Sequence, residues 1–148
     1  HPLSGALLDA NALIALCWPL HEHHARIHRW FAAHASEGWA TCAFTQAAFL
    51  RIVSQPSFAG RAVPMTDVAS SLLHSIAHKQ HRYLASTPDL ATVMATCTGG
   101  VVGHRQVTDA WLLTIAVQHK MKLLTFDQGL SMLLATDAER QRHLTMPA

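Results

Sequence analysis

The hydrophobic positions of the chain fall into short continuous runs that alternate with amphipathic stretches. Residues 6–8 and 122–126 are apolar runs typical of buried strands, and each is followed directly by an aspartate. Residues 21–35 instead carry apolar side chains three and four positions apart, which is the period of a helix with one buried face. Residues 109–120 are apolar almost all round and predict a helix that is buried on several sides.

This alternation continues along the chain. Further strands are predicted at 39–44 and 82–86, further helices at 11–17, 45–55, 66–79 and 88–95, and loops at 57–64 and 98–100. Alternating strands and helices predict an α/β fold, in which helices cover both faces of a central parallel sheet. We expect a single domain over residues 1–148, with residues 1–5 and 137–148 loosely attached.

The composition fits one globular domain, because 50% of the 148 residues are hydrophobic and only 14% are charged. A formal net charge of +2 is too balanced to indicate a basic nucleic-acid-binding face. The first apolar stretch contains Asp9 and Asn11, so we expect neither a membrane span nor a secretory signal. Cys17, Cys42 and Cys97 lack C-x-x-C spacing and are typical of reduced thiols, which favours a cytoplasmic protein.

Three aspartates occupy positions typical of ligand binding in α/β proteins. Asp9 and Asp127 follow predicted parallel strands, so both emerge at the carboxyl edge of the sheet. Asp109 begins the buried helix; for each aspartate, a helix cap or a charge placed at a helix start is the alternative interpretation. If the three converge, each pair about 4 Å apart costs about 4 kcal/mol at an effective dielectric of roughly 20. A cation would relieve this repulsion, and carboxylate oxygens suit Mg²⁺ or Mn²⁺, which can activate water against a phosphodiester.

The ordered motifs resemble the PIN-domain family, in particular the VapC-type ribonuclease toxins of bacterial toxin–antitoxin modules. The matching segments are residues 7–11, 45–51, 104–112 and 124–127. The resemblance implies a three-layer α/β/α fold that cleaves RNA with Mg²⁺ or Mn²⁺ held at Asp9, Asp109 and Asp127. It also implies a cognate VapB-like antitoxin that covers the acidic groove, and a homodimer. The helical segment 68–76 could form the dimer contact or belong to the core.

Six polar residues near these motifs are candidate substrate or supporting contacts: Asn11, Thr45, Gln46, Arg51, His104 and Thr125. The family usually has glutamate where Gln46 stands, and glutamine offers a carbonyl oxygen but no charge. The resemblance therefore implies three formal negative charges in the site instead of four. We favour a metal-dependent endoribonuclease; a catalytically impaired RNA- or protein-binding module and a metal-dependent DNA nuclease are the alternatives.

Twelve histidines, more than the acids, invite interpretation as a metal site. His21, His24 and His28 recur at helical spacing, as do the histidines at 74, 78 and 81. The first group does not complete a zincin motif, because Ala25 stands where the second histidine would have to be. We therefore predict solvated polar faces, whose partial protonation near pH 6 would add positive potential.

Overall fold

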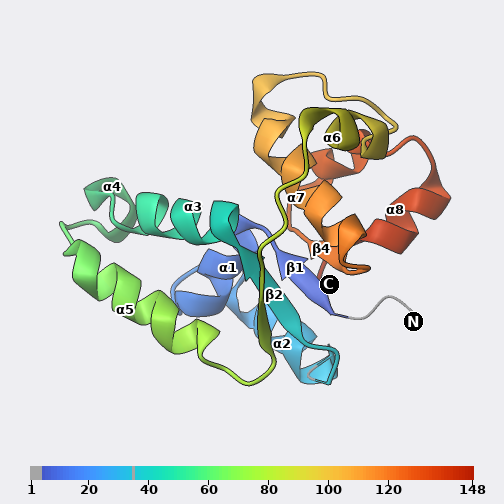
Figure 1. Cartoon of the computed structure of the whole chain (residues 1–148). Coiled ribbons are helices and arrows are strands. Elements are labelled where there is room, and N and C mark those ends of the chain that lie inside the picture. Colours follow the sequence, from blue (N-terminus) through green and yellow to red (C-terminus); the bar gives the residue numbers. More distant parts are fainter. Residues whose placement is uncertain (1–4, 35) are drawn as a thin grey trace.

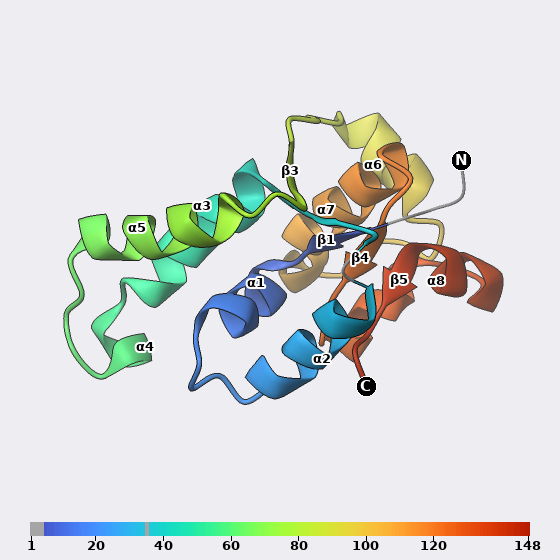
Figure 2. The ribbon, with the colours of Figure 1, turned by 90° about the horizontal axis from the view of Figure 1, so that it is seen from below.

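A computed structural model describes residues 5–34 and 36–148. Its strands form one parallel sheet in the order β3-β2-β1-β4-β5, of which Figure 1 labels the three inner strands and Figure 2 the two edge strands. The central strand β1 (Ala6–Leu8) lies between β2 (Trp39–Cys42) and β4 (Lys122–Leu124), with β3 (His81–Leu84) and β5 (Leu144–Thr145) at the edges. All four pairings are parallel, which confirms the predicted fold class.

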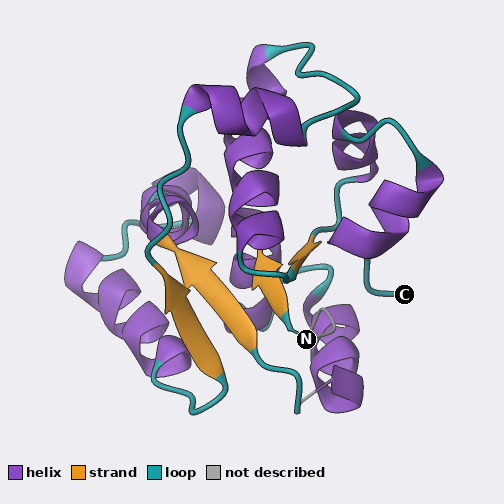
Figure 3. Ribbon diagram, turned by 45° about the vertical axis from the view of Figure 1, so that its right-hand side comes forward, coloured by secondary structure: helices purple, strands orange, loops and turns teal. Residues whose placement is uncertain are grey.

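Helices cover both faces of the sheet (Figures 2 and 3). One layer consists of α1 (Ala10–Cys17), α2 (His24–His34), α3 (Ala43–Val53) and α5 (Met65–Ile76), with the short α4 (Pro56–Ala59) beside α3. The other layer consists of α6 (Leu90–Thr96), α7 (Val107–Gln118) and α8 (Asp137–His143), with the 3₁₀ turns η1 (His104–Gln106) and η2 (Gln128–Leu133). No helix within the described residues is long and apolar enough to cross a membrane.

The central strand is buried on both faces, so its side chains alternate between two hydrophobic cores. Leu7 packs in the core of α6 and α7, whereas Ala6 and Leu8 pack in the core of α1 and α3. Gly5, which precedes this strand, has φ +77°, and a Cβ there would lie 2.7 Å from the Glu37 carbonyl oxygen. The chain therefore enters β1 beside the start of β2 only with glycine at this position.

The boundary between β2 and α3 differs from the prediction. The strand was expected to run to Phe44 with Thr45 as helix cap, but it ends at Cys42, which is itself the cap residue. The hydroxyl of Thr45 accepts a hydrogen bond from the Cys42 backbone N at 3.0 Å and so closes the first turn of the helix. Phe44 consequently lies on the first turn of α3 and not in the sheet.

The C-terminal segment also differs from the prediction, because residues 137–145 form α8 and β5. Thr136 caps α8 by accepting a hydrogen bond from Glu139 N at 3.2 Å, and β5 pairs with β4 in parallel. The hydrophobic pattern missed both elements because α8 has no buried residue and β5 is a two-residue edge strand. Of the other segment expected to be loosely attached, residues 1–4 lie outside the described residues.

Histidines at the start of α2 bind the end of α1. His24 Nδ1 donates to the Ala15 carbonyl oxygen at 2.7 Å, and His28 Nε2 lies 3.2 Å from the Leu16 carbonyl oxygen. Both carbonyls belong to the last turn of α1, where backbone oxygens have no partner inside the helix. These histidines therefore do more than form a solvated face, because they satisfy the exposed end of a neighbouring helix.

Candidate functional site

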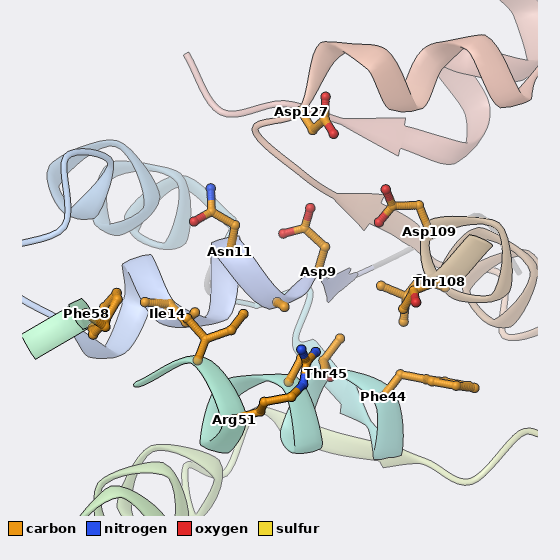
Figure 4. A pocket seen from close by; sticks show the side chains of 14 residues that line it. Asp9, Asn11, Ile14, Phe44, Thr45, Arg51, Phe58, Thr108, Asp109 and Asp127 are labelled. Carbon is orange, nitrogen blue, oxygen red and sulfur yellow. The ribbon is translucent and has the colours of Figure 1, made fainter. Parts of the chain in front are cut away.

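A cavity of about 420 Å³ opens at the carboxyl edge of the sheet, between α1, α3 and α7 (Figure 4). Asp9, Asp109 and Asp127 all line it, although they come from opposite ends of the chain. Asp9 and Asp127 follow the neighbouring strands β1 and β4, and Asp109 lies in the first turn of α7. The parallel pairing of β1 with β4 thus brings Asp9 and Asp127 to the same edge of the sheet.

Asp9 is fixed from several sides. Its backbone N donates to the Leu124 carbonyl oxygen at 3.1 Å, which extends the pairing of β1 with β4 by one residue. Its carboxylate caps α1 by accepting from Ala12 N at 2.8 Å. The side chain is only 6% exposed, and this burial raises its pKa. The polar groups of Thr125 and Ala12 oppose the rise, whereas the charge of Asp127 adds to it.

Thr125 connects the segments that carry two of the acids. It is 1% exposed, its hydroxyl accepts a hydrogen bond from the Asp127 backbone N at 3.0 Å, and it lies close enough to the Asp9 carboxylate to lower the pKa of that group. The Asp127 carboxylate in turn accepts from Gly129 N at 2.9 Å, which caps η2. A single buried hydroxyl therefore holds the backbone at Asp127 and also influences the ionisation of Asp9.

Asp109 experiences the combined effect of the acid cluster. Burial raises its pKa to about 6, with smaller contributions from the charges of Asp9 and Asp127. Asp109 lies in the first turn of α7, a position that by itself favours a negative charge, whereas burial and the neighbouring acids disfavour it. Without a cation, Asp109 therefore loses its proton at a higher pH than an ordinary aspartate does.

The carboxylates share the pocket without forming a closed coordination cage. Across residues 5–34 and 36–148, no group of three or more His, Cys, Asp and Glu side chains is arranged tightly enough to hold an ion unaided. The oxygens nevertheless influence one another, as the pKa of Asp109 shows. The pocket thus gathers hard oxygen donors while leaving space between them.

Three of the polar candidates line the same cavity. Asn11 does so from α1, and its Oδ1 lies 2.9 Å from His21 Nε2. Thr45 also lines it, but its hydroxyl is engaged by the backbone of Cys42. Arg51 points into the cavity from α3, and within the described part of the chain its guanidinium has no hydrogen bond or ion pair (Figure 4).

Gln46 and His104 lie outside the cavity lining. The Gln46 side chain donates from Nε2 to Thr41 Oγ1 at 3.0 Å, and Thr41 Oγ1 lies 2.7 Å from His81 Nε2. His104 begins η1 and is exposed. Gln46, which stands where the family usually carries a fourth acid, is therefore hydrogen-bonded through Thr41 to His81 on the edge strand β3.

The pocket also has an apolar side, which does not follow from the hydrophobic pattern of the sequence. Phe44 lines the pocket from the first turn of α3, and Phe58 does so from α4, where its ring packs edge-on against Trp18 at 5.2 Å. The sequence pattern places Phe44 in a predicted strand and Phe58 in a predicted loop, and neither position indicates a pocket residue. The available signal was an aromatic residue directly before Thr45, beside the expected carboxyl edge of the sheet.

The chain belongs to the PIN domain family, whose model matches residues 6–133. It is 45% identical over 124 residues to Ribonuclease VapC38 of Mycobacterium tuberculosis, covering 84% of this chain and 86% of that protein. It is 36% identical over 126 residues to Ribonuclease VapC39 of the same organism, covering 85% and 91%. The structure of VapBC2 from Rickettsia felis, bound to a DNA fragment from their promoter, has a similar fold. That similarity has a TM-score of 0.66 at 11% identity and covers 97% of this chain and 99% of that chain. The family predicted from the ordered motifs is thereby confirmed.

Proposed function

We propose that this protein is a metal-dependent endoribonuclease and the toxin of a toxin–antitoxin pair. The observation that carries the proposal is the meeting of Asp9, Asp109 and Asp127 in one cavity, in a chain 45% identical to a ribonuclease. Like charges gathered in a partly buried cavity favour a bound cation. The fold places this cavity where open α/β sheets bind their ligands.

The donor set fits Mg²⁺ or Mn²⁺. These hard ions prefer oxygen ligands, and Mg²⁺ keeps several waters while one or two carboxylates hold it, so a closed protein cage is not required. Asp9, Asp109 and Asp127 would hold the ion. When bound, the ion would polarise the phosphodiester and activate a water. The backbone N of Ala12 keeps the Asp9 carboxylate in place. With a pKa of about 6, Asp109 is largely ionised at pH 7.5 and available to a cation.

A VapB-like antitoxin is the partner that we infer from the VapBC2 structure with the similar fold. We also propose a homodimer, for which α5 offers a surface. Its Val68 and Leu72 are buried against the core, whereas Met65 and Leu73 stay exposed. The three cysteines are free, which fits our proposal of a cytoplasmic location.

The test is a digest of single-stranded RNA by the purified protein with Mg²⁺, with Mn²⁺ and with EDTA. We expect cleavage only with metal, and a loss of at least about a hundredfold in Asp9→Asn, because this change removes a ligand charge. Asp67→Asn, which changes an acid outside the pocket, is the matched control. Cleavage that persists in Asp9→Asn would overturn the proposal.

The two alternative functions have their own outcomes in this experiment. A parallel digest of single-stranded DNA tests for a DNA nuclease, which would cut DNA at least as fast as RNA. A catalytically impaired binding module is favoured by Gln46, whose side chain is directed to Thr41. Such a module would bind RNA, leave it intact under all metal conditions, and gain cleavage on Gln46→Glu.

A further inference from the structure

The cavity has a second side that the acids do not account for. Figure 4 shows Phe44, Thr45 and Arg51 projecting from α3 along one side of the cavity, with Asp109 and Asp127 on the other. The acid side is suited to a cation. The α3 side instead combines a basic group with an exposed aromatic ring, which is suited to a different part of a substrate.

Arg51 is the basic side chain among the described residues of the cavity lining. It shares the cavity with three carboxylates, yet no carboxylate oxygen of the described residues lies within ion-pair distance of its guanidinium. The donors of the guanidinium are therefore available to an anion that enters from outside. A guanidinium presents its N–H groups as a planar fork, which matches the oxygens of a phosphate.

Phe44 is 41% exposed on the first turn of the same helix. Phe58 packs its ring against Trp18, but no aromatic partner of Phe44 is found within the described residues. Phe44 and Arg51 are seven residues apart on α3, close to two helical turns, so they project from the same side about 10 Å apart. Adjacent nucleotides of an extended strand can bridge this spacing.

We propose that Arg51 and Phe44 form a nucleotide subsite beside the acids, in which Arg51 binds a phosphate of single-stranded RNA and Phe44 stacks on a neighbouring base. The inference rests on the proposed ribonuclease function, which supplies the RNA. Unpaired bases can be turned out and stacked on an aromatic ring, whereas bases inside a duplex cannot. Phe44 would thus make the enzyme selective for unpaired segments.

The phosphate contact is tested by RNA binding in the Asp9→Asn background, in which the RNA stays intact. Adding Arg51→Gln should raise the Kd for a short single-stranded RNA about tenfold. It should also reduce the slope of log K against log salt by about 0.7, the value for one phosphate contact to a single strand. Arg142→Gln removes the same charge from an exposed position on α8 and should leave the slope unchanged.

The base contact is tested by combining protein and RNA changes in the same background. Phe44→Ala should weaken binding about tenfold without changing the salt slope, and Phe44→Trp should restore binding. An RNA with one abasic nucleotide near the cleavage site should bind the Phe44 protein about tenfold more weakly, but should bind the Phe44→Ala protein no more weakly than intact RNA does. Tyr83→Ala, an exposed aromatic outside the cavity lining, is the control.

Three outcomes would overturn the subsite. Arg142→Gln could change the salt slope as much as Arg51→Gln does, or the Phe44 and abasic losses could simply add. Alternatively, Phe44→Ala could leave RNA binding intact and weaken only the complex with the antitoxin, which would assign this surface to that partner. Thermal unfolding confirms that each variant is folded. The proposed ribonuclease activity is judged separately, by metal-dependent cleavage with the unaltered protein.

Discussion

The acid pocket and the histidine-rich junction between α1 and α2 gather polar side chains in opposite ways. The acids are far apart in the sequence and share one cavity, where their repulsion contributes to the raised pKa of Asp109. The histidines are close in the sequence, but each binds a different partner. The partners of His21, His24 and His28 are the Asn11 side chain and the carbonyl oxygens of Ala15 and Leu16.

This difference indicates that the acid pocket lowers the stability of the metal-free protein, whereas the histidine junction raises it. A group of like charges destabilises the metal-free fold and is retained for binding. A ring nitrogen that donates to a free carbonyl oxygen stabilises the end of a helix. Substitutions in the pocket should therefore lower activity and preserve or raise stability, whereas substitutions in the junction should lower stability and preserve the activity of the folded protein.

The largest effect is expected from the buried hydroxyl of Thr125, which bonds the backbone of one acid and influences the charge of another. Thr125→Val keeps the shape but leaves the Asp127 backbone N without its acceptor and removes the polar group that favours the ionised Asp9 carboxylate. We expect the Mg²⁺ concentration for half-maximal RNA cleavage to rise about 10- to 100-fold, as measured by initial rates in a metal titration.

Two variants make this result specific to the hydroxyl of Thr125. Thr125→Ser keeps the hydroxyl and should restore most of the metal affinity. Thr114→Val removes another buried hydroxyl, which donates to the Ala110 carbonyl oxygen inside α7, and should leave the metal titration unchanged. An unchanged titration in Thr125→Val would show that the hydroxyl does not position the acids.

The next effect is a gain in stability. The pKa of Asp109 is about 6 in the folded protein and 3.8 in the unfolded chain. The folded state therefore binds more protons than the unfolded state at pH values between these two. Stability of the metal-free protein should therefore fall as pH rises from about 4 to about 6. Solvent screens this partly exposed group, so Asp109→Asn should add only about 1 kcal/mol at pH 8, or about 3 °C in Tm.

Thermal unfolding in EDTA at several pH values measures this gain. Asp67→Asn is the control of opposite sign, because Asp67 lies exposed in the first turn of α5 and its charge favours the helix. A Tm for Asp109→Asn that is equal to or below that of the unaltered protein at pH 8 would contradict the cost of keeping Asp109 charged in the fold. RNA cleavage should be lost in the same variant.

A comparable effect of the opposite sign is expected at the junction. His24→Ala leaves the Ala15 carbonyl oxygen without its donor and should lower the free energy of unfolding by about 1 kcal/mol. His74→Ala, at an exposed position on α5, should change it by less than about 0.5 kcal/mol. Denaturant unfolding measures both variants, and the RNA cleavage rate per folded molecule should not change. Loss of cleavage in stable His24→Ala protein would remove the distinction between the two regions.

The sequence predicts the convergence of the acids better than the details around them. Asp9 and Asp127 each follow an apolar run, and parallel strands share a carboxyl edge. The pattern does not specify that β1 and β4 are neighbours or that Ala6 pairs with Lys122, because strand order depends on packing across the whole domain. It gives the edge of the sheet but not which strands lie side by side.

The positions of Phe44 and Gln46 depend on local hydrogen bonds that the sequence pattern does not predict. Phe44 belongs to an apolar run that continues β2, but the hydroxyl of Thr45 accepts from Cys42 N and begins the helix earlier. The orientation of Gln46 depends on the Thr41 hydroxyl, five residues away on a different element. Hydrophobic periodicity carries no information about such hydrogen bonds, so neither result follows from the pattern.

The smallest effect is expected at Gln46. This residue stands where the family usually has a glutamate, but its side chain does not line the acid pocket. Gln46 Nε2 donates to Thr41 Oγ1, which leaves the Thr41 hydroxyl proton available to His81 Nε2. In Gln46→Glu the Thr41 hydroxyl would donate to the new carboxylate, and His81 Nε2 would become a donor to Thr41. The carboxylate would therefore stay outside the acid pocket, and cleavage should change by less than about threefold.

The same substitution should raise the pKa of His81, which burial lowers in the unaltered protein. A nearby negative charge favours protonated imidazole, and the reversed hydrogen bond favours a proton on Nε2. An NMR pH titration of the His81 ring measures this shift alongside the cleavage rate. A gain in cleavage of tenfold or more, with His81 unchanged, would show instead that the carboxylate reaches the acids. Glutamine at this position would then be the reason for a weakened site.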